Sequence, residues 1–342
     1  MLTKNGYRLV VGLSAMGLFL SACGGGSIDD KVDGANTDKP ANEVNVKTED
    51  VVADTPKIEN IGPHKGIDQE PVPIKVERIG EHEVDIDMTS QITNIELDKG
   101  ETYKAWTFNG TVPGPVIRVK EGDKLNFNLK NMDPKINHSV DFHSVYASPN
   151  KDFADVKPNE SGTFSYEVGS PGVYMYHCAT EPVLQHIANG MYGTMIVEPA
   201  DGYPTDNEID KEITVVQSEF YKDGKMEEMV NGEPEYVVFN GSTQAVKDEM
   251  IQAKVGDKIR INFVDAGPNE VSSFHVIGTQ LETVYVDGDP RNVVEGLQTS
   301  MVPVSGSIVA ECTVEKPGIY SFVTHAFDHV TKGALGKIEV TE

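Results

Sequence analysis

The chain of 342 residues repeats itself. Four short blocks in its first half return in the second half, in the same order and at similar spacing: residues 108–110 with 239–241, 119–124 with 253–258, 137–143 with 269–275, and 171–174 with 317–320. Self-similarity of this kind indicates homologous structural units. We therefore expect two copies of one domain, with their boundary near residues 200–204.

The segments around these blocks predict β-strands. Stretches rich in Val, Ile, Thr, Tyr and Phe alternate with turns of Gly, Pro, Asn and Asp, and no long stretch keeps a helical apolar period. The sequence therefore predicts an all-β protein of two tandem β-sandwich domains, at residues 61–200 and 201–342.

The first 22 residues have the pattern of an export signal. Lys4 and Arg8 precede an apolar run over residues 9–20, which is too short to span a bilayer. Cys23 follows Leu-Ser-Ala and precedes three glycines, an arrangement similar to the lipobox of bacterial lipoproteins. We expect removal of this signal peptide, lipidation of Cys23, and an extracytoplasmic protein anchored to the membrane (cell-membrane outer face, or periplasmic or outer membrane) by its lipid.

The segment over residues 23–60 is polar, and the whole chain is acidic. Asp, Glu, Lys, Asn, Thr and Pro dominate this segment, a composition typical of a disordered tether. The formal charge of −25 becomes −27 without residues 1–22, which contain Lys4, Arg8 and no acid. Such a chain is a poor ligand for nucleic acid and is repelled by anionic lipid headgroups. We therefore expect no nucleic-acid partner, and a lipid anchor in place of a basic patch.

The two copies differ in residues that can bind a metal. His138 of the first copy corresponds to Glu270, and we expect no second-copy counterpart of Cys178, His186 or Met191. One thiolate, two imidazoles and one thioether are the ligands of a blue-copper electron-transfer site. Three of them share one loop with the spacing Cys-x₇-His-x₄-Met, so the first domain is predicted to hold a copper.

A second group of histidines surrounds this loop. His177 precedes Cys178 in a strand-like segment, so the two side chains point to opposite faces, and His143 is placed likewise. A third imidazole would complete a three-His site with an open position for substrate. The second copy offers His275 and His325 for that role.

Four motifs resemble those of the copper-containing nitrite reductases: residues 137–143, 176–178, 273–278 and 324–325. The resemblance extends from residue 64 to residue 342. It implies two tandem cupredoxin-like Greek-key β-sandwich domains and a homotrimer with two coppers per chain. It also implies dissimilatory, NO-forming reduction of nitrite, with electrons entering at a type 1 copper and passing to nitrite on a type 2 copper.

The resemblance assigns roles to individual residues. The type 1 copper would be bound by His138, Cys178, His186 and Met191, and the type 2 copper by His143 and His177 of one subunit with His325 of the next. Asp141 and His275 would deliver protons, and Ile277 would restrict how nitrite sits. The electron donor would be a c-type cytochrome or a small cupredoxin.

Some features depart from the family or leave alternatives open. Family members often have one more residue in the type 1 loop, and a polar residue is common where Ala326 stands. By the repeat alone, Asp141 could cap a turn and His275 could be a hydrogen-bonded strand histidine. Cys312 lies in an alternating strand pattern and is predicted to be a core residue. Histidines without such support are predicted to face solvent: His64, His82 and His329.

Three other functions compete with nitrite reduction. A multicopper oxidase needs about eight histidines, largely in His-x-His pairs, and this chain has no such pair. An electron carrier would need the Cys178 site alone and would leave the other histidines unexplained. A structural lipoprotein would need neither site.

Overall fold

The computed structural model describes residues 71–342. The predicted signal peptide, Cys23, the tether and His64 therefore lie outside the described residues. Within residues 71–342, no helix has the length and apolar character needed to cross a membrane.

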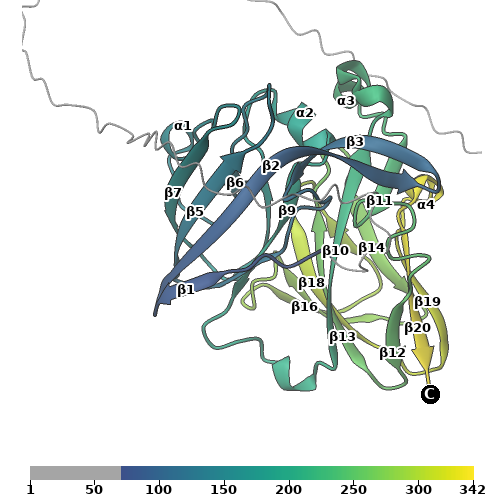
Figure 1. The fold of residues 1–342 in the computed structure, drawn as a ribbon. Coiled ribbons are helices and arrows are strands. Elements are labelled where there is room, and N and C mark those ends of the chain that lie inside the picture. Colours follow the sequence, from purple (N-terminus) through teal and green to yellow (C-terminus); the bar gives the residue numbers. More distant parts are fainter. Residues whose placement is uncertain (1–70) are drawn as a thin grey trace, which may run out of the picture. The chain divides into compact units, whose positions relative to one another are not determined.

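The first half of the described chain folds into two packed sheets (Figure 1). One sheet contains β1 (Glu77–Gly80), β2 (Glu83–Asp98), β3 (Glu101–Phe108), β5 (Lys124–Asn131) and β7 (Ser161–Glu167). The other contains β4 (Ile117–Lys120), β6 (Asp141–Phe142), β8 (Gly172–His177) and β9 (Tyr192–Glu198). Alternate residues such as Val84, Ile86 and Leu125 point between the sheets and form one apolar core, as the period of two in a strand requires.

The second half builds a second pair of sheets. One sheet contains β10 (Lys211–Phe220), β11 (Tyr236–Phe239), β13 (Lys258–Asp265), β15 (Leu281–Val286), β16 (Val293–Leu297) and β18 (Ser307–Thr313). The other contains β12 (Ile251–Lys254), β14 (Ser272–Ile277), β17 (Ser300–Val302), β19 (Gly318–Thr324) and β20 (Leu335–Thr341). Cys312 is fully buried in the core between them, which confirms its predicted place.

Strand pairing repeats between the halves. The parallel pairs β2–β5 and β4–β9 return as β10–β13 and β12–β20, and the antiparallel pair β8–β9 returns as β19–β20. Parallel neighbours cannot be joined by a tight hairpin, so the chain crosses between sheets in the Greek-key manner. The predicted all-β class with two tandem sandwiches is confirmed.

Short helices lie in the loops. They are α1 (Pro149–Asp152), α2 (Val183–Ala188), α3 (Met226–Asn231) and α4 (Phe327–Lys332), with 3₁₀ turns η1 (Asp206–Glu208) and η2 (Lys222–Gly224). Helix α2 connects β8 to β9, and α4 connects β19 to β20, so the two helices occupy matching positions.

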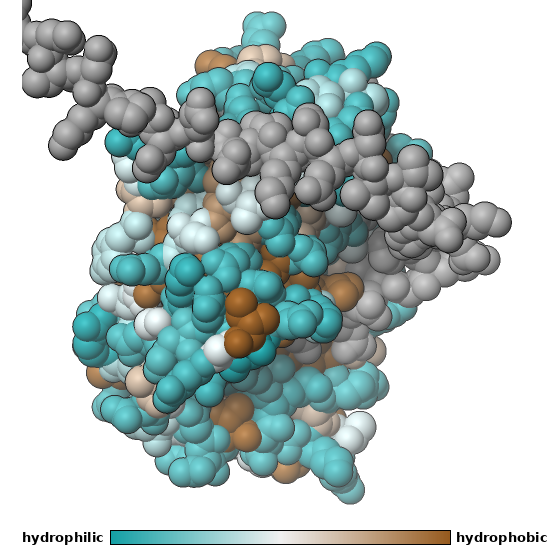
Figure 2. Space-filling model, turned by 60° about the vertical axis from the view of Figure 1, so that its left-hand side comes forward, coloured by the Kyte–Doolittle hydropathy of each residue, from teal (hydrophilic) through white to brown (hydrophobic). Residues whose placement is uncertain are grey.

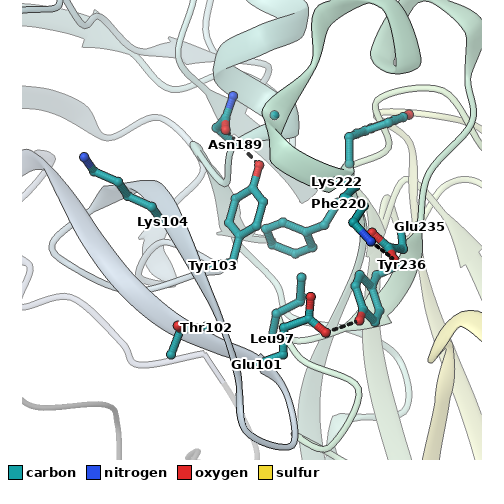
Figure 3. A pocket seen from close by; sticks show the side chains of 12 residues that line it. Leu97, Glu101, Thr102, Tyr103, Lys104, Asn189, Phe220, Lys222, Glu235 and Tyr236 are labelled. Atoms are coloured by element: carbon teal, nitrogen blue, oxygen red, sulfur yellow. Dashed lines mark hydrogen bonds and ion pairs between the residues drawn. The ribbon is translucent and has the colours of Figure 1, made fainter.

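The two halves pack on each other through a shared apolar cluster. Val173 and Met175 of β8 belong to this cluster together with Val216 and Val264 of the second half. A cavity of about 400 Å³ lies between β3 and the β10–β11 pair, with Tyr103 on its wall (Figure 3). The predicted boundary near residue 200 falls in the connection between β9 and β10. Hydrophilic residues predominate on the face drawn in Figure 2, in keeping with the acidic composition.

Candidate metal centres

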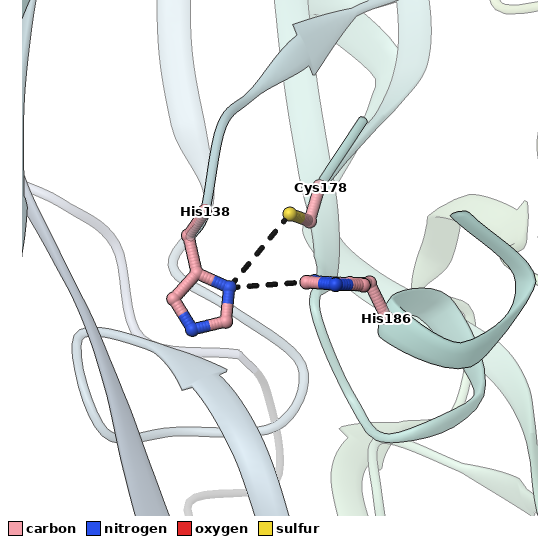
Figure 4. A group of neighbouring side chains, drawn as sticks. All are labelled: His138, Cys178 and His186. Atoms are coloured by element: carbon pink, nitrogen blue, oxygen red, sulfur yellow. Dashed lines mark hydrogen bonds between the residues drawn. The ribbon is translucent and has the colours of Figure 1, made fainter. Parts of the chain in front are cut away.

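Three side chains of the first half converge on one buried point (Figure 4). Nδ1 of His138 lies 3.3 Å from Nδ1 of His186 and 3.9 Å from Sγ of Cys178. All three residues are buried. Two imidazole nitrogens and a sulfur that face one another, with no other partner placed between them, form the donor arrangement of a metal site.

Strand and helix ends hold these ligands in place. Cys178 directly follows β8, His186 lies in α2, and Met191 directly precedes β9. The backbone N–H of Met191 donates to the carbonyl of His186 at 3.1 Å, and that of Cys178 donates to the carbonyl of Met191 at 3.1 Å. Met191 is fully buried in the same apolar cluster as Cys178, where its thioether can serve as a weak ligand.

A buried carboxylate orients the first imidazole. Oδ2 of Asp133 lies 3.4 Å from Nε2 of His138, and Oδ1 of Asp133 accepts backbone N–H groups from Lys135 and Ile136. With Nε2 turned to the carboxylate, Nδ1 remains as the free donor atom, which is the usual outer-shell arrangement of a metal-binding histidine.

Burial favours the neutral form of the two imidazoles. It lowers the pKa of His138, although Asp133 opposes the shift. Burial and the neighbouring His138 lower the pKa of His186 to about 4. A neutral imidazole is the form that binds a metal, so the shifts prepare the site for one.

The sulfur has polar support of its own. The backbone N–H of Ser139 donates to Sγ of Cys178 at 3.4 Å, and the Ser139 hydroxyl lies 3.1 Å from that of Thr180. Thr180 in turn donates to Asp155 at 2.7 Å. Burial raises the pKa of the Cys178 thiol against these hydrogen bonds, so a bound cation would be needed to hold the thiolate. The donor set and its surroundings fit copper.

His177 faces the other way, as predicted. Its Nε2 lies 3.1 Å from Nε2 of His143 and 3.9 Å from Oδ2 of Asp141. Asp141 pairs with His177 across β6 and β8, which brings the carboxylate beside the ring. His143 is exposed at the surface, and partial desolvation together with the neighbouring His177 lowers its pKa, although Asp141 opposes the shift. We call these three residues the first half-site.

His275 and His325 form a second half-site on another sheet. His275 lies in β14 and His325 directly follows β19, with ring centroids 5.6 Å apart. Nδ1 of His275 contacts the carbonyl of Gln298. His325 is exposed and touches Phe327, and Ile277 of β14 is 44% exposed.

The structure does not bring the two half-sites together. Among residues 71–342, the groups able to hold a metal are the buried set and the first half-site, and neither includes His275 or His325. Of the three type 2 ligands predicted by resemblance, His143 and His177 meet, whereas His325 lies apart from them.

Three predictions about the second copy are wrong. His329 was expected to face solvent, but it is 5% exposed, and its Nε2 lies 3.5 Å from Oε2 of Glu270. It also occupies the place of His186, because its carbonyl accepts the N–H of Ala334 just as that of His186 accepts the N–H of Met191. The second domain therefore does have a counterpart of His186. The counterpart of His138 is Ser272 and not Glu270, because Ser272 pairs with Val302 as His138 pairs with Val156. His82 is exposed, as predicted.

Sequence reasoning missed the residues that surround the buried set. Asp133 stands in an ordinary polar stretch, and nothing local marks it as a partner of His138. Trp106 is the single tryptophan of the chain, a signal that could have drawn attention to it. Its ring centroid lies 4.8 Å from that of His186.

Comparison with known proteins agrees with this geometry. A multicopper oxidase family model matches residues 89–202. The copper-containing nitrite reductase of Neisseria meningitidis is 40% identical over 283 residues, which cover 79% of this chain and 72% of the relative. The solved copper nitrite reductase from Nitrosomonas europaea is 37% identical, with a TM-score of 0.72 over 76% of this chain and 94% of that one. A solved multicopper oxidase is 25% identical, with a TM-score of 0.71 over 80% of this chain and 95% of that one.

Two tandem cupredoxin-like sandwiches with a buried His₂Cys donor set define a two-domain copper protein. Within that class, the identity over most of both sequences settles the family. The chain belongs to the copper-containing nitrite reductases.

Proposed function

We propose that this protein reduces nitrite to nitric oxide. The reaction consumes one electron and two protons per nitrite and yields one nitric oxide and one water. Electrons would enter at a type 1 copper held by His138, Cys178, His186 and Met191, and pass to nitrite at a type 2 copper. The observation that carries the proposal is the step from His177 to Cys178, since these adjacent residues face the first half-site and the buried donor set.

Each donor set suits its task. Bound copper would exchange single electrons in the buried set, and in a three-imidazole site it would hold nitrite at its open position. The buried ligands are fixed by backbone hydrogen bonds and by Asp133, so little has to rearrange when charge changes. The peptide link between His177 and Cys178 gives a covalent path between the two sets.

The third imidazole would come from His325 of the partner subunit. His143 and His325 are both exposed and directly follow strands of different sheets, β6 and β19, so each half-site can face a neighbouring molecule. A contact between two different surfaces must close into a ring or grow without limit. The family resemblance implies a homotrimer.

Proton delivery would use one group from each half-site. The Asp141 carboxylate lies beside His177, and His275 lies beside His325, so assembly would place a carboxylate and an imidazole on opposite sides of nitrite. Such a pair can hold and release protons near neutral pH. The exposed side chain of Ile277 would limit the orientations open to nitrite.

The electron donor would be a c-type cytochrome or a small cupredoxin with a basic docking face. Helix α2, which carries His186, contacts α3 through an apolar cluster that includes Leu184 and Met226. Next to it, Val230 is 67% exposed and Glu227 is exposed. Lys222 and Lys225 are exposed beside it as well, so the charge that favours a basic partner is the net charge of −25 of the whole chain. A lipid on Cys23 would hold the enzyme at the extracytoplasmic membrane surface, and Cys23→Ser should release it into the soluble fraction.

Mixed assemblies test the interfacial site. His143→Ala and His325→Ala chains should each be inactive alone, because every interface lacks one ligand. After subunit exchange in equal amounts, random mixing leaves about one quarter of the interfaces intact, so nitric oxide production should return to about that fraction. Dead mixtures after confirmed exchange, or a fully active monomer by light scattering, would exclude the shared site.

Copper content separates the enzyme from an electron carrier. The purified parent should hold two coppers per chain, and His325→Ala should hold one while keeping its visible colour. One copper per chain in the parent would favour a carrier. The family-model match raises multicopper oxidation as a second candidate, but the absence of any His-x-His pair argues against it. Oxygen consumption without nitrite reduction would reverse that conclusion.

A further inference from the structure

Strand β3 is fastened to the helix that carries His186. The backbone N–H of Trp106 donates to the carbonyl of Asn189 at 2.9 Å, and the Tyr103 hydroxyl donates to Oδ1 of Asn189 at 2.8 Å (Figure 3). Asn189 follows the last residue of α2 and donates through Nδ2 to the carbonyl of Gln185 at 2.7 Å. One buried side chain thus closes the end of α2 and ties it to β3.

The same strand places an aromatic ring against both imidazoles. The Trp106 ring centroid lies 4.8 Å from that of His186 at an interplanar angle of 72°, and 6.1 Å from that of His138 at 65°. Both are edge-to-face contacts, the arrangement that aromatic rings favour. His186 therefore has Trp106 on one side and His138 on another, and these contacts restrict its rotation.

His186 has little polar support apart from its partner ligand. His138 is oriented by Asp133, whereas the hydrogen bond found for the His186 ring among the described residues is the one to Nδ1 of His138. A bound metal would replace that hydrogen bond, so it does not orient His186 in the loaded site. The backbone N–H of Trp106 bonds to the residue after helix α2, and the Trp106 ring contacts His186 within that helix.

We propose that Trp106 is a positioning residue for the type 1 site. It holds the His186 imidazole toward Cys178 before copper binds, and its bulk limits the access of water to that ring. Tyr103 assists by fixing Asn189 and with it the end of α2. The proposal rests on the type 1 assignment made above and adds a residue outside the ligand set.

The single tryptophan gives a readout that does not depend on activity. Copper(II) added stepwise to the metal-free full-length protein should quench tryptophan emission in proportion to the visible absorption that develops, because Trp106 is the only tryptophan. The Cys178→Ala protein is the control for copper bound elsewhere, and its emission should change little.

Substitution separates positioning from simple packing. Trp106→Leu keeps an apolar side chain but removes the ring, and copper affinity should fall about three- to tenfold with a shifted visible band. Trp106→Phe keeps a ring and should rescue both, and Tyr103→Phe should give a smaller change in the same direction. Thermal unfolding of each metal-free variant shows whether it folds.

The outcomes are distinct. Unquenched emission while the parent's visible band develops, or a folded Trp106→Leu protein with unchanged affinity and spectrum, would overturn the positioning role alone. A Trp106→Phe protein no better than Trp106→Leu would also overturn it. A parent that develops no visible band would overturn the type 1 assignment and this proposal together.

Discussion

The two domains have the same backbone hydrogen bonds in the loop at the end of the sandwich, but the side chains held there differ. In the first, the N–H groups of Met191 and Tyr192 donate to the carbonyls of His186 and Gly190. In the second, Ala334 and Leu335 make the same two bonds to His329 and Gly333. The backbone is therefore shared, and the side chains decide whether the position can bind a metal.

The second domain has a polar contact in place of a donor set. Ser272 stands where His138 stands and Thr324 stands where Cys178 stands, because the N–H of Ser273 donates to Thr324 as that of Ser139 donates to Cys178. Nε2 of His329 lies 3.5 Å from Oε2 of Glu270. Without a thiolate or a thioether, the remaining imidazole has no soft ligand to share a copper with. The comparison shows that the backbone of the ligand loop is kept in a domain that lacks the metal-binding side chains.

The two domains also differ in a buried polar residue at the end of matching strands, Asn131 in the first and Asp265 in the second. Asn131 pairs with Ser90 across β2 and β5, and Asp265 pairs with Gln217 across the matching strands β10 and β13. Nδ2 of Asn131 donates to the carbonyls of Ile136 and Val156 at 2.8 and 2.9 Å.

An ionised Asp265 carboxylate has no hydrogen-bond donor that corresponds to the Nδ2 amide of Asn131. Its Oδ1 accepts the N–H of Gly267, whereas its buried Oδ2 has no hydrogen-bond partner among the described residues. Burial raises the pKa of Asp265 well above its usual 3.8, so the folded protein keeps this carboxyl protonated at higher pH than the unfolded chain does.

The largest expected effect separates the two buried cysteines. Cys178→Ala should abolish the visible band, because only a copper–thiolate bond would give that band, and nitrite reduction, because electrons enter there in the proposed function. Cys312→Ala should keep both and lose about 1 kcal/mol of stability through the small cavity it leaves. Absorption spectra, nitric oxide production and denaturant unfolding measure these changes. Unchanged colour in Cys178→Ala would remove the type 1 assignment.

The next prediction restores metal-binding side chains to the second-domain loop around His329. In a Cys178→Ala background, the triple substitution Ser272→His, Thr324→Cys and Ala334→Met should bind copper and regain a visible band, because the backbone around His329 matches that around His186. The double variant without Thr324→Cys is the control and should stay colourless. A colourless triple variant that folds would show that the two loops are not interchangeable.

A smaller effect is expected from exchanging the buried amide and carboxyl. Asp265→Asn should raise the free energy of unfolding at neutral pH by about 1–2 kcal/mol, since the amide restores a donor and cannot ionise. Because the raised pKa makes the folded parent hold a proton that the unfolded chain releases, parent stability falls as pH rises above 3.8. The gain in the variant should therefore grow with pH. Asn131→Asp should lose stability in the same range, and equal denaturation midpoints would contradict both expectations.

The smallest effect concerns the two unassigned histidines of the described chain. His329→Ala should lower the free energy of unfolding by about 1 kcal/mol, because it leaves a cavity and an unpaired Glu270. His82→Ala, at an exposed position, should stay within about 0.5 kcal/mol of the parent. Equal losses in urea unfolding would show that burial of His329 contributes nothing.

Much of the candidate site could be predicted because its information is local. The spacing of Cys178, His186 and Met191 puts three donors on one loop, and the step from His177 to Cys178 puts two ligands on opposite faces of a strand. The alternating pattern around Cys312 was enough to place it in a core. Nothing local indicated that Asp133 would meet His138, or that His329 would be buried.

By itself, the sequence determined the repeat, the all-β class and the identity of the buried donor set, because strand alternation and loop spacing act over a few residues. Only the tertiary structure decided which residues surround that set, because β3 and α2 are brought together by long-range sheet closure. It also decided that His325 does not join His143 and His177 within the described chain. That placement depends on how the two sandwiches pack through the apolar cluster that contains Val173 and Val264, residues far apart in the sequence.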